Sequence, residues 1–235
     1  MAVRSAYVRL ARGVRRQAQY LGLLEALESR QGWWLGHART LFAIYDSEDL
    51  ARLDLPWWTY RAITEVEAFL ASREAPRVFE FGSGASTVWL ARRVSTLHTV
   101  EHDEEFARLV RSMLEGLPHV TLHQVPATTA GASASPTTSE RMGHGDLDFT
   151  DYVATIDQVG GPFDLVVVDG RARLACLDRA LDHLAPGGRI LFDDVRRRRY
   201  RSALTLKGTQ VRVLSGAKPS LPYPDATALL RLRPD

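Results

Sequence analysis

The chain has 235 residues, of which 45% are hydrophobic and 25% charged, and its formal net charge is +2. These values are typical of a soluble globular protein, and so small a charge does not by itself predict nucleic-acid binding. No apolar run approaches the ~20 residues of a membrane span, and the single cysteine, Cys176, excludes an internal disulfide. We therefore expect a cytoplasmic protein with no membrane partner.

Residues 1 to about 70 carry helical patterns, in which apolar positions repeat every three or four residues. The amino terminus is also rich in arginine. It fits a targeting segment, a basic helix that binds a surface, or a helix packed on the rest of the chain, and we favour the last. A further helix is expected from about 57 to 72. These patterns predict a helical cap over 1–73, followed by a second domain at 74–235.

From residue 77 onward, short strands alternate with helices, which predicts an α/β domain with a parallel sheet and right-handed crossovers. Val166, Val167 and Val168 form an apolar run without alternation, as expected of a strand covered on both faces. Asp103 is expected to cap a helix that has acidic residues in its first turn. The strands are expected at 77–81, 97–102, 120–125, 163–169 and 189–194, and the helices at 85–94, 103–117 and 172–185.

The carboxyl-terminal part departs from this alternation. Residues 209–214 and 226–233 are strand-like, and the link between them is too short for a crossover helix, so we expect an antiparallel pair. Residues 126–149 are rich in Ala, Ser, Thr and Gly, and they are longer than a typical connection between elements. They are either a functional lid or a disordered segment, and we favour a partly mobile lid loop over the site.

The stretch "EFGSGAST", residues 80–87, joins the first strand of the second domain to its first helix. Glycines there let a ligand approach the backbone closely, and a helix N-terminus favours an anion. The stretch lacks the Gly-Lys-Ser/Thr ending of a triphosphate loop, and Thr87 stands where a dinucleotide fingerprint has its third glycine. Glu80 would repel a pyrophosphate but suits an ammonium group, which favours an amino-acid-bearing cofactor. Glu101, 19 residues after Gly82, stands where a ribose-binding acid belongs.

Four successive segments, "EFGSGAST", "VEHDEEF", "FDLVVVDGR" and "LAPGGRILFDD", resemble the motifs of class I S-adenosylmethionine-dependent methyltransferases. The resemblance covers the chain from about residue 56 and implies a Rossmann-like, seven-stranded, mostly parallel sheet with an antiparallel carboxyl-terminal hairpin. It also implies S-adenosylmethionine as the cofactor, with its ribose on Glu101 and its adenine beside His102. The acid that many members carry after the third strand is absent from "QVPATT". The residues expected to bind the cofactor are Glu80, Gly82, Ser83, Gly84, Ser86, Thr87, Glu101 and His102.

Three aspartates follow the last two parallel strands: Asp169, and the pair Asp193 and Asp194. Neighbouring carboxylates repel one another unless a cation or a proton lies between them, and three such oxygen donors suit Mg²⁺. The arrangement resembles that of cation-dependent O-methyltransferases, in which the metal fixes and activates the acceptor oxygen. The match is incomplete, because Ala172 stands where some members have a lysine base. The alternative is that these aspartates cap helices or pair with nearby arginines, such as those in "DDVRRRRYR".

We therefore expect O-methylation of a small molecule, with Asp169 as a catalytic residue and His144 as the candidate general base. The alternatives are an RNA or protein methyltransferase, suggested by the basic amino terminus and the arginine cluster, and a non-catalytic scaffold that keeps the fold. The expected partners are the small-molecule acceptor and a second copy of the chain in a homodimer; nucleic acid is not expected. The residues expected near the acceptor are Trp57, Trp58, Tyr60 and Arg171.

Overall fold

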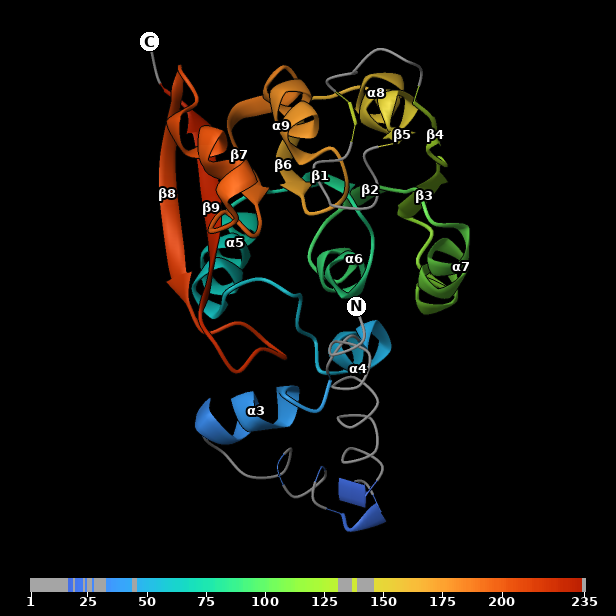
Figure 1. Cartoon of the computed structure of the whole chain (residues 1–235), viewed down its shortest axis with the longest axis vertical. Helices are drawn as coiled ribbons and strands as arrows, with labels where there is room; N and C mark the ends of the chain where they lie inside the picture. The colour runs from blue at the N-terminus through green and yellow to red at the C-terminus, as the bar shows by residue number, and fades with distance from the viewer. Residues whose placement is uncertain are drawn as a thin grey trace.

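The computed structural model describes residues 17–18, 20–22, 24, 27, 33–43, 46–130, 137–138 and 146–233. A seven-stranded sheet in the order β3-β2-β1-β6-β7-β9-β8 forms its centre (Figure 1). Neighbouring strands from β3 to β7 pair in parallel, and β9 pairs antiparallel with both β7 and β8. This is the Rossmann-like sheet with an antiparallel carboxyl-terminal hairpin that the sequence predicts.

Most strands lie close to their predicted limits, because they are largely apolar runs between polar or glycine-rich turns. The prediction for β7 is wrong at its start: the strand begins at Leu184 and not at Arg189, because Leu184 already pairs with Phe163 before an irregularity in the register. Phe81 at the end of β1 pairs with Val100 of β2 and with Val168 of β6. The carboxyl ends of these parallel strands therefore meet at one edge of the sheet. The strands of this sheet are β1 (Arg77–Phe81), β2 (Thr96–Glu101), β3 (Val120–Gln124), β6 (Phe163–Val168), β7 (Leu184–Phe192), β8 (Thr209–Gly216) and β9 (Asp225–Leu232).

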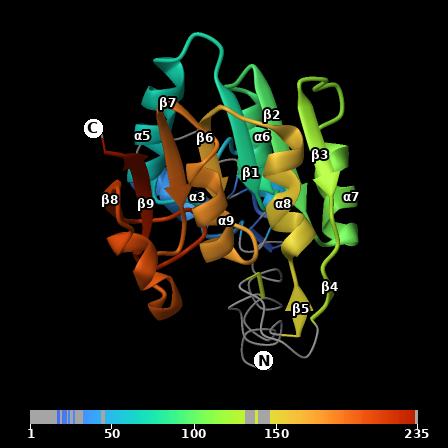
Figure 2. The ribbon, with the colours of Figure 1, turned by 90° about the horizontal axis from the view of Figure 1, so that it is seen from above.

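Helices cover both faces of the sheet, and Figure 2 shows α8 and α9 in front of it. Successive residues of β6 point to opposite faces: Val166 and Val168 pack with α8 and α9, while Leu165 and Val167 pack with α5 and α6. All four side chains are fully buried, which explains why this strand shows no polar alternation. The helices are α5 (Tyr60–Ala71), α6 (Ala85–Ala91), α7 (Glu104–Met113), α8 (Thr150–Val159) and α9 (Arg173–Leu181).

Two helix starts show how local hydrogen bonds set the boundaries. The side chain of Asp103 accepts a hydrogen bond from the backbone N–H of Phe106 at 2.9 Å, so Asp103 caps α7 as predicted. Helix α5 begins at Tyr60, three residues later than predicted. Thr59 has an extended backbone there, and its hydroxyl accepts a hydrogen bond from the N–H of Ala62 at 3.3 Å. Trp57 and Trp58 therefore precede the helix, and they point in different directions.

Helix α8 is absent from the sequence-based expectations, which leave this stretch irregular. Its sequence, TDYVATIDQV, is rich in β-branched residues, which are weak helix formers. Burial of Tyr152, Val153 and Ile156 against the sheet stabilises the helix. In the predicted lid at 126–149, the short strands β4 (Thr128–Thr129) and β5 (Leu147–Asp148) pair antiparallel. Most of the intervening residues lie outside the described part of the chain.

The amino-terminal part contains two short helices, α3 (Trp33–Thr40) and α4 (Ser47–Arg52), and α4 packs on α6. Leu50 of α4 lies in one buried cluster with Val88 of α6. The buried guanidinium of Arg39 donates two hydrogen bonds to the carboxylate of Asp49, at 2.9 and 2.8 Å, which joins α3 to α4. The basic segment at residues 1–16 lies outside the described residues. Among those described, no helix is long and apolar enough to cross a membrane.

Candidate active site

A cavity of about 490 Å³ lies at the carboxyl ends of β1, β2, β6 and β7. Open parallel sheets bind their ligands at this edge, and the volume is within the range of small-molecule sites. The lining combines the turn after β1, the ends of the strands and the segment between β8 and β9. The residues around the cavity are Ser47, Trp57, Gly82, Ser83, Gly84, Ala85, Ser86, Glu101, His102, Asp103, Phe106, Asp169, Gly170, Arg171, Arg173, Asp193, Asp194, Arg197, Lys218, Ser220, Leu221, Tyr223 and Asp225.

The turn after β1 requires glycine because two backbone segments touch there. Gly82 has a φ of +93°, and a Cβ on it would lie 2.5 Å from the Cα of Gly170. A Cβ on Gly170 would in turn meet the hydroxyl of Tyr152. The segments that follow β1 and β6 can approach each other only as bare backbone. This close approach forms the base of the cavity beside Ser83 and Gly84, as expected of a turn that holds a cofactor.

Glu80 lies beneath this turn and not in the cavity. Its side chain is fully buried, and its two oxygens accept hydrogen bonds from Ser86 Oγ at 2.5 Å and Thr87 Oγ1 at 2.6 Å. Thr87 Oγ1 also accepts a hydrogen bond from the N–H of Gly84 at 2.9 Å. The expectation that Glu80 and Thr87 touch the cofactor is therefore corrected. Both hold the start of α6 in place, and Ser86 is the member of this group that reaches the cavity.

We expect the stability of the protein to depend on the ionisation of Glu80. Burial raises the pKa of Glu80 to about 7, against the opposing effect of the hydrogen bonds from Ser86 and Thr87. The unfolded chain therefore releases this proton at a lower pH than the folded chain does, so stability falls as the pH rises from the ordinary carboxyl pKa to about 7. Between about pH 5 and about pH 8 the wild type should lose about 2 to 3 kcal/mol of unfolding free energy that Glu80→Gln does not lose.

Denaturant unfolding of both proteins at the two pH values measures this difference. Asp178→Asn on α9 is a control for the loss of an exposed acid elsewhere in the chain. An equal pH dependence in the wild type and in Glu80→Gln would show that Glu80 ionises normally.

Glu101 ends β2 at the wall of the cavity and is 4% exposed. Its Oε1 accepts hydrogen bonds from the backbone N–H groups of His102 at 2.8 Å and Asp103 at 2.9 Å, and its Oε2 accepts one from Ser83 Oγ at 3.1 Å. Although burial raises the pKa of Glu101, the bonds from His102 and Asp103 outweigh this effect and lower it. The group is therefore an oriented carboxylate, able to accept hydrogen bonds from a ligand's hydroxyl groups.

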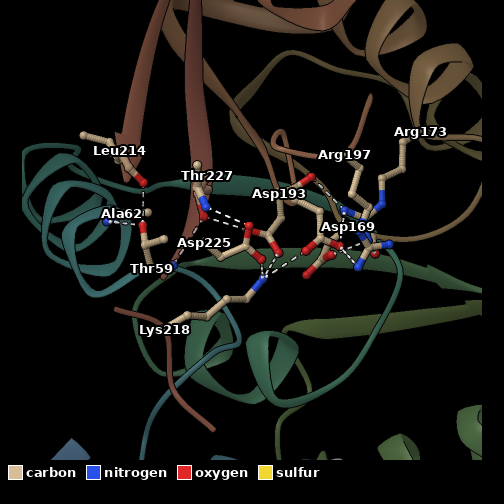
Figure 3. A network of polar contacts seen from close by, with 12 residues as sticks. Thr59, Ala62, Asp169, Arg173, Asp193, Arg197, Leu214, Lys218, Asp225 and Thr227 are labelled. Atoms are coloured by element: carbon tan, nitrogen blue, oxygen red, sulfur yellow. Dashed lines mark hydrogen bonds and ion pairs between the residues drawn. The ribbon is translucent and has the colours of Figure 1, made fainter. Parts of the chain in front are cut away.

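The structure brings the three predicted aspartates together. One oxygen from each of Asp169, Asp193 and Asp194 lies within 4.8 Å of the others. Figure 3 shows that Asp169 and Asp193 share this space with Lys218, which comes from the segment between β8 and β9. Its Nζ lies 2.5 Å from Asp193 Oδ2, 3.3 Å from Asp194 Oδ1 and 3.4 Å from Asp225 Oδ2. The predicted alternative, in which basic side chains pair with the aspartates, is therefore present in the structure.

Two arginines complete this network. Arg173 is 6% exposed; it donates to Asp169 Oδ1 at 2.6 Å and to the carbonyl oxygen of Asp193 at 2.8 Å, and it lies 3.3 Å from Asp194 Oδ2. Arg197 lies 2.6 Å from the same oxygen of Asp194. Arg197 is thus the member of the arginine cluster at 196–201 that enters the site.

These contacts control the charges of the cluster. Burial alone would raise the pKa of Asp194, but Arg173, Lys218 and Arg197 hold it well below its usual range. Burial would likewise lower the pKa of Lys218, but the carboxylates of Asp193 and Asp194 raise it well above its ordinary value. Burial raises the pKa of Asp193 to about 7, and Lys218 opposes this effect. Because Lys218 holds its proton more tightly than Asp193 does, Lys218 stays an ammonium throughout the pH range in which Asp193 titrates, and the pair is an ammonium and a carboxylate above about pH 7.

Three non-glycine residues at or next to this site have strained backbone conformations. Ala172, Asp194 and Ser220 have positive φ angles of 45°, 62° and 65°. Such conformations cost roughly 1–3 kcal/mol each in non-glycine residues and cluster at functional sites. Ser220 is held by hydrogen bonds from its N–H to Thr40 Oγ1 and from its Oγ to the carbonyl oxygen of Ala43, both at 3.1 Å. The segment that carries Lys218 is therefore anchored to the amino-terminal helices.

Only some of the residues predicted near the acceptor line the cavity in the structure. Trp57 and Arg171 line the cavity. Trp58 does not: it is fully buried against Trp89 in the hydrophobic core. Tyr60 is also outside the lining, and its hydroxyl contacts His37 Nδ1 at 3.3 Å. His144, the predicted general base, lies outside the described residues.

Sequence reasoning missed several residues of the cavity because they come from the segment between β8 and β9. Leu221 and Tyr223 line the same cavity as Trp57, and Asp225, the first residue of β9, lies 3.4 Å from the ammonium of Lys218. One signal was available for Lys218, since the chain has only two lysines, Lys207 and Lys218, among its 30 basic residues. The loop sequence alone does not indicate which strand end it contacts.

The fold and the site define an α/β protein with a cavity at the carboxyl edge of its sheet. A glycine turn after the first strand and an acid at the end of the second strand line this cavity. Residues 79–195 match the model of a family described as a methyltransferase domain. The chain therefore contains a methyltransferase domain, carried on a Rossmann-like methyltransferase fold. No curated protein matches its sequence.

Solved structures share this fold at low sequence identity. Cofactor-bound Rv0187 from MTB is 21% identical, with a TM-score of 0.59 over 81% of this chain and 89% of that one. An O-methyltransferase from Bacillus cereus, in complex with SAH, is 18% identical, with a TM-score of 0.56 over 93% and 97% of the two chains. A putative O-methyltransferase from Klebsiella pneumoniae is 20% identical, with the same TM-score and coverage. At these identities the similarity shows the fold alone.

Proposed function

We propose that this methyltransferase acts on a hydroxyl oxygen of a small molecule that binds in the described cavity. The observation that carries the proposal is the lining, which holds two kinds of residue in one space. The turn at Gly82 and the carboxylate of Glu101 suit the cofactor, and we call them the cofactor side. Trp57, Leu221 and Tyr223 are aromatic and apolar, and we assign them to the acceptor side. The O-methyltransferases among the structures with this fold agree with the proposal.

On the cofactor side, the polar groups are those of Glu101 and of the turn after β1, which the close contact of Gly82 with Gly170 holds in place. Glu101 would accept hydrogen bonds from the ribose hydroxyls, and Ser83, Gly84 and Ser86 would surround the methionine moiety. His102 and Phe106 follow Glu101 in the chain and also line the cavity, and they would contact the adenine. S-adenosylmethionine supplies a methyl group that is already activated on a sulfonium, so the chain mainly has to align the acceptor oxygen and receive its proton.

On the acceptor side, we propose that Asp169 is the base that receives the proton of the acceptor's hydroxyl group. Arg173 holds its Oδ1 at 2.6 Å, while its Oδ2 accepts no hydrogen bond from any residue in the described part of the chain. The side chain is 21% exposed, more than that of Asp193 or Asp194, and it lines the cavity. Arg173 thus fixes the direction of the carboxylate, and the other oxygen can accept a hydrogen bond from an acceptor hydroxyl.

Calorimetric titration of S-adenosylhomocysteine tests the cofactor side. Glu101→Ala removes the proposed ribose acceptor, and a hydrogen bond to a charged group contributes about 1.5–3 kcal/mol, so we expect binding at least roughly tenfold weaker. Glu104→Ala, an exposed acid in the first turn of α7, is the matched control and should bind like the wild type. Thermal melting must show that both variants are folded, and unchanged affinity in a folded Glu101→Ala would contradict the proposed cofactor site.

The acceptor side is tested by following transfer of a labelled methyl group to a panel of small hydroxylated molecules, with total RNA and protein as competing acceptors. Label in a small molecule that Asp169→Asn fails to methylate would support the proposal. Label that accumulates in RNA or protein instead would contradict a small-molecule acceptor.

A further inference from the structure

The aspartate cluster at the ends of β6 and β7 has the composition of a divalent-cation site, but a cationic side chain already stands in it (Figure 3). Lys218 is 5% exposed, and its ammonium contacts Asp193 Oδ2 at 2.5 Å and Asp194 Oδ1 at 3.3 Å. The charge that three neighbouring carboxylates require is therefore supplied by the chain itself.

The other oxygens of the aspartate pair are also bonded. Asp193 Oδ1 accepts a hydrogen bond from Thr227 Oγ1 at 2.6 Å, and Asp194 Oδ2 lies 2.6 Å from Arg197 Nη2. Mg²⁺ needs near-octahedral oxygen ligands at about 2.0–2.1 Å. Two like charges a few ångströms apart repel strongly in a partly buried site, and a divalent ion would repel the ammonium of Lys218 more strongly than a single charge does. A metal could enter only if Lys218 left.

The structure opposes movement of the Lys218 side chain out of the aspartate cluster. Lys218 stands two residues before Ser220, which is 2% exposed and is hydrogen-bonded to Thr40 and Ala43. If its ammonium withdrew, four carboxylates, those of Asp169, Asp193, Asp194 and Asp225, would remain with only the guanidinium groups of Arg173 and Arg197. An unbalanced buried charge of this kind is strongly destabilising. The residues present therefore do not fit a bound divalent metal.

We propose that Lys218 permanently occupies the cation position of this cluster, and that the enzyme transfers methyl groups without a divalent metal. Lys218 is then a positioning residue. It holds Asp193 and Asp194 at the end of β7, and it fixes the segment that presents Leu221 and Tyr223 to the cavity. The occupancy of the cation position does not depend on the acceptor; the statement about metal-free transfer rests on the function proposed above.

Mn²⁺ titration, followed by the electron paramagnetic resonance signal of the free ion, tests the occupancy directly. The wild type should bind no Mn²⁺ at micromolar concentration. Lys218→Ala should open the site and bind one ion per chain, with an affinity roughly 100-fold above that of the wild type. Lys207→Ala removes the only other lysine, which is exposed, and should behave like the wild type. A cooperative thermal melting transition shows independently that each protein is folded.

Micromolar Mn²⁺ binding by the wild type would overturn the proposal, as would a folded Lys218→Ala that binds no Mn²⁺. If Lys218→Ala does not fold, Lys218→Gln, which keeps a donor for Asp193 but loses the charge, takes its place, and the wild-type measurement still decides whether a metal binds. Once an acceptor is known, chelation with EDTA should leave kcat unchanged. A loss of activity that Mg²⁺ restores would refute metal-free transfer and leave the assignment of the methyltransferase intact.

Discussion

Gly82→Ala should weaken the binding of S-adenosylhomocysteine roughly 100-fold, because it displaces the base of the cofactor site. Two effects combine at this position. The φ of +93° is unfavourable for any residue with a side chain, and the added Cβ would lie 2.5 Å from the Cα of Gly170. The contact is with backbone, so no side chain can rotate away. The segments after β1 and β6 must separate, and Ser83 and Gly84 move with them.

Gly116→Ala provides a matched control. Gly116 has a similar φ of +80°, but a Cβ there would meet no atom within 4 Å. This substitution should carry the backbone strain without the collision, and so it should lower stability by about 1 kcal/mol while leaving cofactor affinity unchanged. Calorimetric titration and thermal melting of both variants separate the two effects. Similar affinities for Gly82→Ala and the wild type would mean that the turn does not shape the cofactor site.

The second large effect is expected for Asp193→Ala, which should lower the unfolding free energy by about 3–5 kcal/mol. The substitution removes the closest partner of a buried ammonium, since Lys218 Nζ lies 2.5 Å from Asp193 Oδ2. It also leaves the buried hydroxyl of Thr227 without its 2.6 Å acceptor. For a chain of this length, the melting temperature should fall by roughly 10 °C.

The exposed ion pair of Glu65 and Arg212 provides the control for Asp193→Ala. Glu65 lies 2.8 Å from Arg212 at the surface of the sheet, where the guanidinium side chain is 60% exposed. Because such pairs contribute about 0–1 kcal/mol, Glu65→Ala should scarcely change the melting temperature. A loss for Asp193→Ala as small as that for Glu65→Ala would show that Lys218 is not held as a buried ion.

Much of the fold could be predicted because its signals are local. The apolar runs at β1 and β6, the cap at Asp103 and the glycines after β1 each act within a few residues. The gathering of Asp169 with Asp193 and Asp194 could also be predicted, since the ends of neighbouring parallel strands share one edge of a sheet. The helix α8 was missed because its stability comes from packing on the sheet and not from the propensities of its residues.

The roles of adjacent residues were harder to predict. Trp57 and Trp58 precede a helix in irregular backbone, where no periodicity predicts that one lines the cavity and the other lies in the core. Glu80 ends a strand beside the cofactor turn, but two hydroxyls of α6 turn its carboxylate away from the cavity. In both cases the direction of a side chain depends on elements that fold against it.

The sequence by itself determined the class of this protein: an α/β sheet with a cofactor turn after its first strand and carboxylates at its strand ends. Only the tertiary structure decided what neutralises those carboxylates. Lys218 follows Asp194 by 24 residues, and it reaches the cluster because β9 returns antiparallel beside β7 and the loop before it is tied to the amino-terminal helices. A charge balance of this kind depends on distances between segments remote in the chain, which no local pattern encodes.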